Sequence, residues 1–243
     1  MTNSSSPLAL VTGAGIRLGR ASAVKLAESG FDILVHYNRS EAPAQETVNL
    51  VEAAGQKAWP IQADLSSEGG INSLVAATKQ HSRGLDALVN NASIFYPTSK
   101  PEDWVKHWDT YQMVNLKSPF LLTMGVLDLL KQNKGCVVNI VDIWAKFPLK
   151  RFLPYSVAKS GLEALTKCLA LELAPDIRVN GVSPGAALPP PNSDDSMDKM
   201  LSQVPLKCYG GAESIAGAVD YLCQAEYVTG QILAVDGGRS INL

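Results

Sequence analysis

Short apolar runs alternate with amphipathic segments along almost the whole chain. The apolar runs predict strands at 8–12, 32–37, 58–63, 86–91, 136–141, 177–182 and 231–236. The segments between them carry apolar residues at helical spacing and predict helices at 18–29, 41–54, 66–82, 102–131, 153–173 and 212–224. Strands that alternate with helices are typical of right-handed βαβ units. The pattern therefore predicts an α/β fold, a doubly wound, seven-stranded parallel sheet with helices on both faces.

One segment interrupts this alternation. Residues 183–200, SPGAALPPPNSDDSMDKM, contain a proline cluster that does not belong in a central strand. The segment follows the sixth strand, so it should lie at the carboxyl edge of the sheet, where ligands bind in such folds. We interpret it as a substrate loop, with a flexible surface loop as the alternative. No repeat or linker divides the chain, and residues 1–243 are expected to form a single domain.

Composition narrows the function classes. Hydrophobic residues make up 46% and charged residues 18%, and the formal net charge is −2, so nothing indicates a nucleic-acid or membrane-surface partner. The start lacks the positive region of a signal peptide, and the apolar stretch FLLTMGVLDLL is too short to span a bilayer. The four cysteines have no CxxC or regular spacing, which favours reduced thiols in a cytoplasmic enzyme over disulfides or a metal site.

A glycine-rich turn follows the first predicted strand. In VTGAGIRLGRA, Gly13, Gly15 and Gly19 are spaced G-x-G-x-x-x-G, one residue longer than the common dinucleotide fingerprint. Glycines permit a tight turn and a close approach of backbone N–H groups to a pyrophosphate at a helix N-terminus. The turn therefore predicts a Rossmann-type dinucleotide site. Its cofactor-binding residues are expected to be Gly13, Ile16, Arg17 and Leu18. Arg17 is expected to meet a phosphate or a ligand lying on the cofactor, with a solvated helix-end arginine as the alternative.

The end of the second predicted strand favours NADP over NAD. Enzymes that use NAD usually place an acid there to hold the ribose 2′-hydroxyl. This chain has no acid before Glu41 and offers donors that suit a 2′-phosphate instead: His36, Tyr37, Asn38, Arg39 and Ser40.

Three further stretches fit the cofactor. In QADLSS, Asp64 and Leu65 follow the third strand, where Asp64 would bond the adenine amino group or, equally, cap the next helix. Residues at the ends of the fourth and sixth strands would line the nicotinamide half: Asn91, Ala92, Ser93, Pro184 and Gly185.

Tyr155 and Lys159 are four residues apart on a predicted helix, hence on one face. A nearby ammonium favours the phenolate and is expected to lower the pKa of Tyr155 from about 10. Tyr155 would then act as a proton donor, and Lys159 would also hold the ribose hydroxyls of a cofactor. The alternative is an ordinary surface pair.

These motifs together resemble the short-chain dehydrogenase/reductase family. The likeness rests on TGxxxxxG, NNA at 90–92, Asn115 in YQMVNL, YSVAK at 155–159 and SPG at 183–185, and it covers essentially the whole chain. It implies that Tyr155 donates a proton while NAD(P)H delivers hydride. It also implies that Lys159 lowers the tyrosine pKa and that Asn115 supports a water relay.

Two positions depart from that family pattern. Most members carry serine where this chain has Asp142 and glycine where it has Arg17. A serine hydroxyl donates to a substrate carbonyl, whereas an ionised carboxylate only accepts. Asp142 therefore favours a substrate rich in N–H donors, or a C=N bond whose nitrogen must be protonated. We predict that Asp142, Tyr155 and Lys159 form a proton-delivery set for imine reduction.

Within the family, TGAGIRLGR, HYNRS, NNASIFYPT and VD…YSVAK resemble the pteridine reductases. The resemblance implies that Arg17 contacts cofactor phosphate and pterin, Phe95 stacks on the pterin, Ser93 bonds it, and Asp142 with Tyr155 delivers the proton. Taken alone, Phe95 fits the core equally well. The resemblance also implies a homotetramer packed through long helices, with the C-terminal VDGGRSINL near a neighbouring subunit's site.

The sequence thus predicts an NADPH-dependent reductase of pterins. Dihydrobiopterin, dihydromonapterin and dihydrofolate are candidate substrates, and reduction of fully oxidised pterin is left open. A carbonyl reductase such as a 3-oxoacyl-carrier reductase is the first alternative. A non-catalytic NADP(H)-binding sensor is the second.

Overall fold

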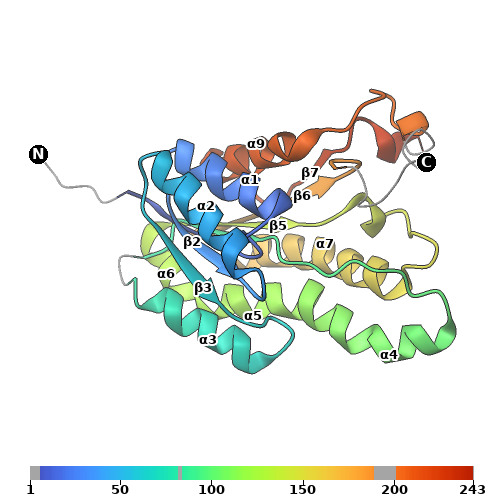
Figure 1. Ribbon diagram of the computed structural model, residues 1–243, viewed down its shortest axis with the longest axis horizontal. Helices are drawn as coiled ribbons and strands as arrows, with labels where there is room; N and C mark the ends of the chain where they lie inside the picture. Colours follow the sequence, from blue (N-terminus) through green and yellow to red (C-terminus); the bar gives the residue numbers. More distant parts are fainter. Residues whose placement is uncertain (1–5, 82–83, 189–200, 243) are drawn as a thin grey trace, which may run out of the picture.

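A parallel sheet forms the centre of the computed structural model, which describes residues 6–81, 84–188 and 201–242 (Figure 1). The order of its seven strands is β3-β2-β1-β4-β5-β6-β7, which confirms the predicted fold class. The strands are β1 Leu8–Val11, β2 Asp32–Tyr37, β3 Ala58–Gln62, β4 Ala87–Asn90, β5 Cys136–Ile140, β6 Arg178–Pro184 and β7 Ile232–Val235.

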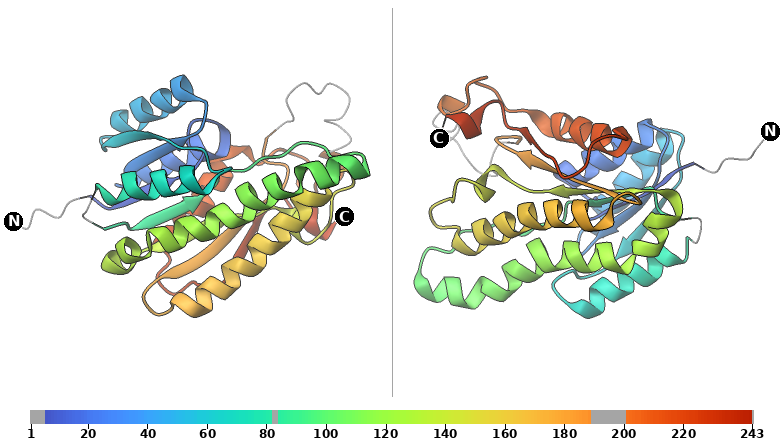
Figure 2. Two further views of the ribbon diagram at one scale, coloured as in Figure 1. Left: turned by 90° about the horizontal axis from the view of Figure 1, so that it is seen from below. Right: turned by 180° about the vertical axis from the view of Figure 1, so that it is seen from behind.

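Helices cover both faces of this sheet (Figures 1 and 2). One face carries α1 Arg17–Glu28, α2 Glu41–Ala53 and α9 Gly211–Gln224. The other carries α3 Glu68–Lys79, α4 Pro101–Gln112, α5 Ser118–Gly125, α6 Leu127–Asn133 and α7 Leu153–Leu173. Alternate residues of β1 supply the two cores: Ala9 and Val11 pack on the first face, Leu8 and Leu10 on the second. Both faces of β1 are thereby buried.

The strand order reverses between β1 and β4. From β1 the chain builds outward through β2 to β3, then returns to place β4 on the other side of β1. Ligands in doubly wound sheets bind in the crevice at the carboxyl ends of the strands beside such a reversal. The glycine-rich turn after β1 and the segment after β4 meet at this crevice.

The predicted continuous helix at 102–131 is wrong. After α4 the chain forms a π-helix, Met113–Lys117, then α5, and it bends by 59° before α6. Pro119 contributes to the irregularity, since it lacks the N–H that would donate to the carbonyl of Asn115 in a regular α-helix. Helical periodicity in the apolar residues persists across these breaks, which is why the pattern alone did not reveal them.

Other boundaries differ less. The helix predicted at 66–82 spans Glu68–Lys79, and residue 82 lies outside the described residues. In the predicted substrate loop, residues 183–184 extend β6, and 189–200 lie outside the described residues. Among the described residues no single helix is long and apolar enough to cross a bilayer; the bent pair 101–125 and 127–133 meets that test jointly.

Candidate active site

The glycine-rich turn forms a cradle at the start of α1. Gly13 has φ +64°, in the left-handed region, and a Cβ at Gly19 would collide with the Gly13 carbonyl oxygen. The N-cap residue Ile16 has no polar side chain, so its side chain satisfies none of the first N–H groups of α1. These groups suit a pyrophosphate. Arg17 begins the helix at φ +52° with an exposed side chain, and this left-handed backbone explains why glycine is common there.

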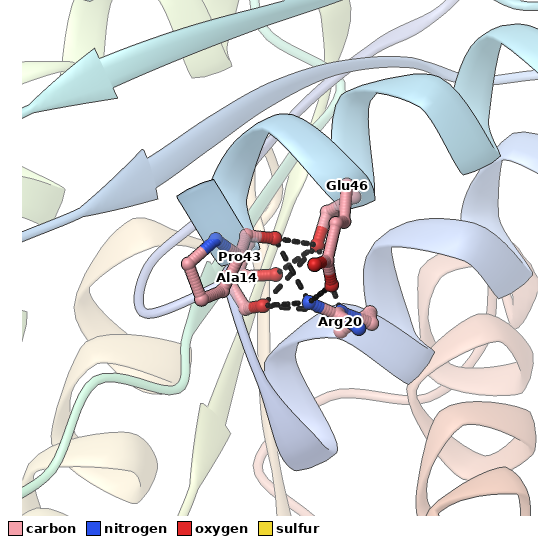
Figure 3. A network of polar contacts seen from close by, with 6 residues as sticks. Ala14, Arg20, Pro43 and Glu46 are labelled. Atoms are coloured by element: carbon pink, nitrogen blue, oxygen red, sulfur yellow. Dashed lines mark hydrogen bonds and ion pairs between the residues drawn. The ribbon is translucent and has the colours of Figure 1, made fainter. Parts of the chain in front are cut away.

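Arg20 fastens this turn to α2, a role that motif reading missed (Figure 3). Its guanidinium donates to the carbonyl oxygens of Gly15 at 2.8 Å and Pro43 at 2.9 Å, and pairs with Glu46 at 2.8 Å. Thr47 on α2 donates to the Ala14 carbonyl at 3.0 Å. The second predicted helix is therefore tied directly to the phosphate cradle.

Asn91 and Ala92 hold the same turn from the β4 side. Both of their backbone N–H groups donate to Thr12 Oγ1 at 2.9 Å. Asn91 Nδ2 donates to the carbonyls of Thr12 at 2.8 Å and Gly13 at 3.2 Å. The amide nitrogen of Asn91 thus fixes the turn, while the expectation that these residues also line the nicotinamide half stays a prediction.

His36 does not face a 2′-phosphate, contrary to the sequence prediction. Its side chain is 2% exposed, and Nδ1 accepts from Gly13 N at 3.0 Å while Nε2 lies 3.1 Å from the Ala63 carbonyl. Burial lowers the pKa of His36 to about 4, so the ring is neutral. The histidine therefore stabilises the glycine-rich turn by accepting the hydrogen bond from Gly13 N.

The remaining residues at the end of β2 stay available to a cofactor. Arg39 is exposed and its charge acts on Asp64, whose pKa is lowered mainly by hydrogen bonds from Ser66. Asn38 donates to Asp64 at 3.2 Å, and Ser40 is the N-cap residue of α2. Asp64 is not the cap of α3, because Ser67 holds that position and accepts from Gly70 N at 3.1 Å. Its adenine contact stays a prediction.

Five further predicted cofactor residues lie in the apolar cores or at the carboxyl edge of the sheet. The Leu65 side chain is buried in the core on one face of the sheet, and the half-buried Leu18 and Tyr37 pack against the core on the other face. Leu65 can therefore meet a cofactor through its backbone alone. Pro184 ends β6, and Gly185 N donates to the Val235 carbonyl at 3.1 Å, which places both at the carboxyl edge of the sheet.

Asn115 lies in the π-helix and fixes the segment after β4. Its Oδ1 accepts from Ile94 N at 2.9 Å, and its Nδ2 donates to the Ile94 carbonyl at 3.0 Å. The side chain is thus engaged, and a water relay would use the main-chain carbonyl that Pro119 leaves without its regular helical donor. The relay stays a prediction.

The three residues of the predicted proton-delivery set lie close together: Asp142, Tyr155 and Lys159. Tyr155 Oη donates to Asp142 Oδ2 at 2.5 Å, and Trp144 N donates to Asp142 Oδ1 at 3.0 Å. Lys159 Nζ donates to the Ile140 carbonyl at 2.7 Å and lies 5.8 Å from the centre of the Tyr155 ring. Tyr155 and Lys159 are 4% and 2% exposed, which excludes an ordinary surface pair.

The predicted lowering of the Tyr155 pKa is wrong for this arrangement. Burial and the charge of Asp142 raise the pKa of Tyr155 well above its ordinary value. Burial also raises the pKa of Asp142, against the hydrogen bonds from Tyr155 and Trp144. Burial lowers the pKa of Lys159 to about 8. Lys159 bonds a backbone carbonyl rather than the phenol, and the carboxylate dominates the field at Tyr155.

Aromatic side chains border the phenol. Phe95 is 54% exposed, so it is not a core residue. Its ring stacks on Phe152 with centroids 4.4 Å apart and meets the Tyr155 ring edge-on at 4.8 Å. Ser93, two residues earlier, is also exposed. Motif reading identified Phe95 but missed Phe152, which precedes α7.

Arg239 is a further residue that the sequence analysis did not single out. It lies in a short 3-10 helix, Arg239–Ile241, and its guanidinium carbon sits 4.9 Å from the centre of the Trp144 ring. Arg239 contacts Trp144 of its own chain, and the prediction that the C-terminal segment lies near a neighbouring subunit's site stays a prediction. Its charge acts on Asp142.

Comparison with known proteins agrees with this architecture. The family model described as enoyl-(acyl carrier protein) reductase, of the short-chain alcohol dehydrogenase type, matches residues 13–240. The chain belongs to the short-chain dehydrogenase/reductase family. Members of this family are oxidoreductases that use NAD(P)(H).

Relatives cover nearly the whole chain. Glucose 1-dehydrogenase 2 of Bacillus subtilis is 32% identical over 96% of this chain and 94% of its own length. A 3-oxoacyl-[acyl-carrier-protein] reductase of Synechocystis is 34% identical over 98% of each chain. The crystal structure of acetoin dehydrogenase from Enterobacter cloacae superposes with a TM-score of 0.91 at 33% identity, covering 99% of this chain and 98% of that one.

Proposed function

We propose that this oxidoreductase reduces pterins with NADPH, converting a dihydropterin such as dihydrobiopterin, dihydromonapterin or dihydrofolate to its tetrahydro form. The observation that carries the proposal is the 2.5 Å hydrogen bond from Tyr155 to Asp142. A protonated Asp142 in this pair can return a proton to Tyr155 as the phenol gives up its own, which the much weaker acid of a serine hydroxyl would not do. A ring nitrogen that must gain a proton is served by this pair.

The cofactor site fits NADPH. The N-terminus of α1 and the Gly13–Gly19 cradle suit the pyrophosphate, and the exposed Arg39 with Ser40 suits the 2′-phosphate. Lys159 would hold ribose hydroxyls. NADPH, when bound, supplies the hydride that reduces the carbon of the substrate C=N bond.

The proton reaches the nitrogen through Tyr155. A phenolate beside an ionised Asp142 is strongly disfavoured, as the raised pKa of Tyr155 indicates. The raised pKa of Asp142 favours its protonated form, which can donate to the phenol oxygen. Tyr155 then passes its own proton to the nitrogen while it takes the proton of Asp142. The nitrogen becomes N–H, the carboxylate is left ionised, and no phenolate forms.

Phe95 supplies a surface for a flat bicyclic substrate. One contact of its ring is taken by Phe152, yet 54% of the residue stays exposed beside Tyr155. Offset stacking on such a ring contributes about 0.5–1.5 kcal/mol beyond burial of area. A pterin on Phe95 would present its ring nitrogen to the phenol.

A carbonyl reductase is the second candidate, favoured by the relatives. Their names describe a glucose dehydrogenase, 3-oxoacyl-[acyl-carrier-protein] reductases and acetoin dehydrogenases. The carboxylate at Asp142 is the feature that separates this chain from the expected carbonyl-binding hydroxyl.

The test is a panel of substrates, with each reaction monitored by the change in NADPH absorbance. Dihydropterins with small and large side chains on the pyrazine ring are compared with acetoacetyl thioesters, acetoin and glucose, each with NADPH or NADP⁺ as required. We expect dihydropterins to show the highest kcat/KM. Faster turnover of a thioester or ketone would establish the second candidate. Tight NADPH binding without turnover of any substrate would support a sensor.

A further inference from the structure

Two buried donors beside the candidate site have no acceptor among the described residues. Arg239 is 8% exposed, yet its Nε has no hydrogen-bond partner, and Nη2 makes one long contact of 3.3 Å with Gln203 Oε1. The hydroxyl of Tyr209 is likewise buried and unpartnered, and Tyr209 lies close enough to Arg239 to influence it electrostatically. Leaving a buried donor without an acceptor is costly, and more so for a charged group.

The chain builds a defined support for Arg239. Asp236, just after β7, accepts from Gly238 N at 2.9 Å and Ser240 N at 2.8 Å, so its carboxylate shapes the turn that presents the arginine. The guanidinium rests on Trp144, and Trp144 N donates to Asp142 Oδ1 at 3.0 Å. Arg239 is thus joined to the proton-delivering carboxylate through one residue.

We propose that Arg239 is a substrate-binding residue that donates, with Tyr209, to the 4-oxo oxygen of the pterin ring. This inference rests on the proposed function. In a pterin, O4 and N5 occupy neighbouring positions on the fused rings and point to the same side. Reduction of the C6=N5 bond protonates N5, so the donor to O4 must lie beside Tyr155 and Asp142, as Arg239 does through Trp144.

A neutral oxo group fits this place better than an anion. The positive charge of Arg239 is already opposed by two carboxylates, Asp142 and Asp236. A carbonyl oxygen has two acceptor sites, which matches the two unpartnered donors. A bound carboxylate would add a third negative charge next to Asp142.

The test removes the 4-oxo group from the substrate and, separately, the guanidinium of Arg239 from the protein. A methyl-substituted dihydropterin and its analogue with hydrogen in place of the 4-oxo group are each assayed with NADPH, and their kcat/KM values are compared. A hydrogen bond from a charged donor is worth about 1.5–3 kcal/mol, so wild type should prefer the oxo compound by about 10- to 100-fold. In Arg239→Met the preference should fall below about 3-fold.

Control variants separate recognition from damage. Asn242 lies in the same C-terminal segment, and its exposed Nδ2 donates to the Gln203 carbonyl at 3.1 Å. Asn242→Ala removes this hydrogen bond and should leave the preference for the oxo compound unchanged. Tyr209→Phe should lower it partly. NADPH binding by fluorescence checks that each variant is folded.

The outcomes distinguish the two claims. If wild type reduces the dihydropterin but Arg239→Met keeps the full preference, the role of Arg239 is refuted and the proposed function stands. Equal kcat/KM values of wild type for the two compounds would also refute the role of Arg239. If wild type reduces no dihydropterin while it binds NADPH, both claims fail together.

Discussion

Replacing Lys159 by methionine should stabilise the folded chain while it abolishes turnover. Lys159 is 2% exposed, and burial lowers its pKa from 10.5 to about 8. One pKa unit corresponds to about 1.4 kcal/mol, so the buried ammonium costs about 3 kcal/mol of folding free energy near neutral pH. Methionine leaves the Ile140 carbonyl without its 2.7 Å donor, a loss of about 1 kcal/mol. The variant should therefore gain about 2 kcal/mol.

The stability gained by Lys159→Met should depend on pH. Below the folded-state pKa of about 8 the lysine is charged in both states, so folding bears the full burial cost. As pH rises from about 8 toward 10.5, the folded chain loses the proton first and wild type recovers stability. The gain of Lys159→Met should thus shrink to near zero by about pH 9.5.

Urea unfolding of wild type and Lys159→Met at about pH 7 and about pH 9.5 measures the difference. Lys57→Met, at an exposed position, is the control and should stay within about 0.5 kcal/mol at both pH values. A destabilised Lys159→Met at pH 7, or a gain that does not change with pH, would show that the buried lysine is not under electrostatic strain.

Three further predictions concern protonation, cofactor choice and assembly. Because Asp142 acts in its protonated form, kcat/KM for a dihydropterin should fall as pH rises through the raised pKa of this carboxyl, and Asp142→Asn should lose that limb of the profile. Arg39→Glu should raise the KM for NADPH about 10- to 100-fold and leave the KM for NADH within about 3-fold; equal effects on both would remove Arg39 from the 2′-phosphate site. We propose a tetramer packed through α4 and α7, where Val105 is 83% and Val157 42% exposed. Light scattering should give the mass of four chains for wild type and a smaller mass for Val105→Glu with Val157→Glu, whereas a monomeric wild type would contradict this.

Local patterns along the chain were enough to predict the sheet, its helical layers and the motif residues. Continuous apolar runs such as LALV and CVVNI carry the strand assignment without help from distant residues. Gly13, Tyr155 and Lys159 were found because their spacing relative to these strands is characteristic.

Contacts between distant segments were not predictable in this way. Asn115, in the π-helix that interrupts the predicted helix, bonds the backbone of Ile94, twenty-one residues earlier, and spacing along the chain does not reveal such a contact. His36 was predicted at a phosphate site because of its residue type, but it is buried and bonds the glycine-rich turn instead. The Tyr155 pKa was predicted with the wrong sign because spacing on a helix brought Lys159 into consideration, whereas Asp142, from another element, makes the hydrogen bond.

The most direct test of the account is the ratio of pterin to ketone reduction in wild type and in Asp142→Ser. The assay compares kcat/KM for a dihydropterin and for an acetoacetyl thioester, with NADPH binding measured in parallel as the check on folding. Serine should lower dihydropterin reduction at least about 100-fold, an amount expected for a lost proton donor, and should leave thioester reduction unchanged or improve it. An unchanged rate with the dihydropterin would contradict the role assigned to the carboxylate.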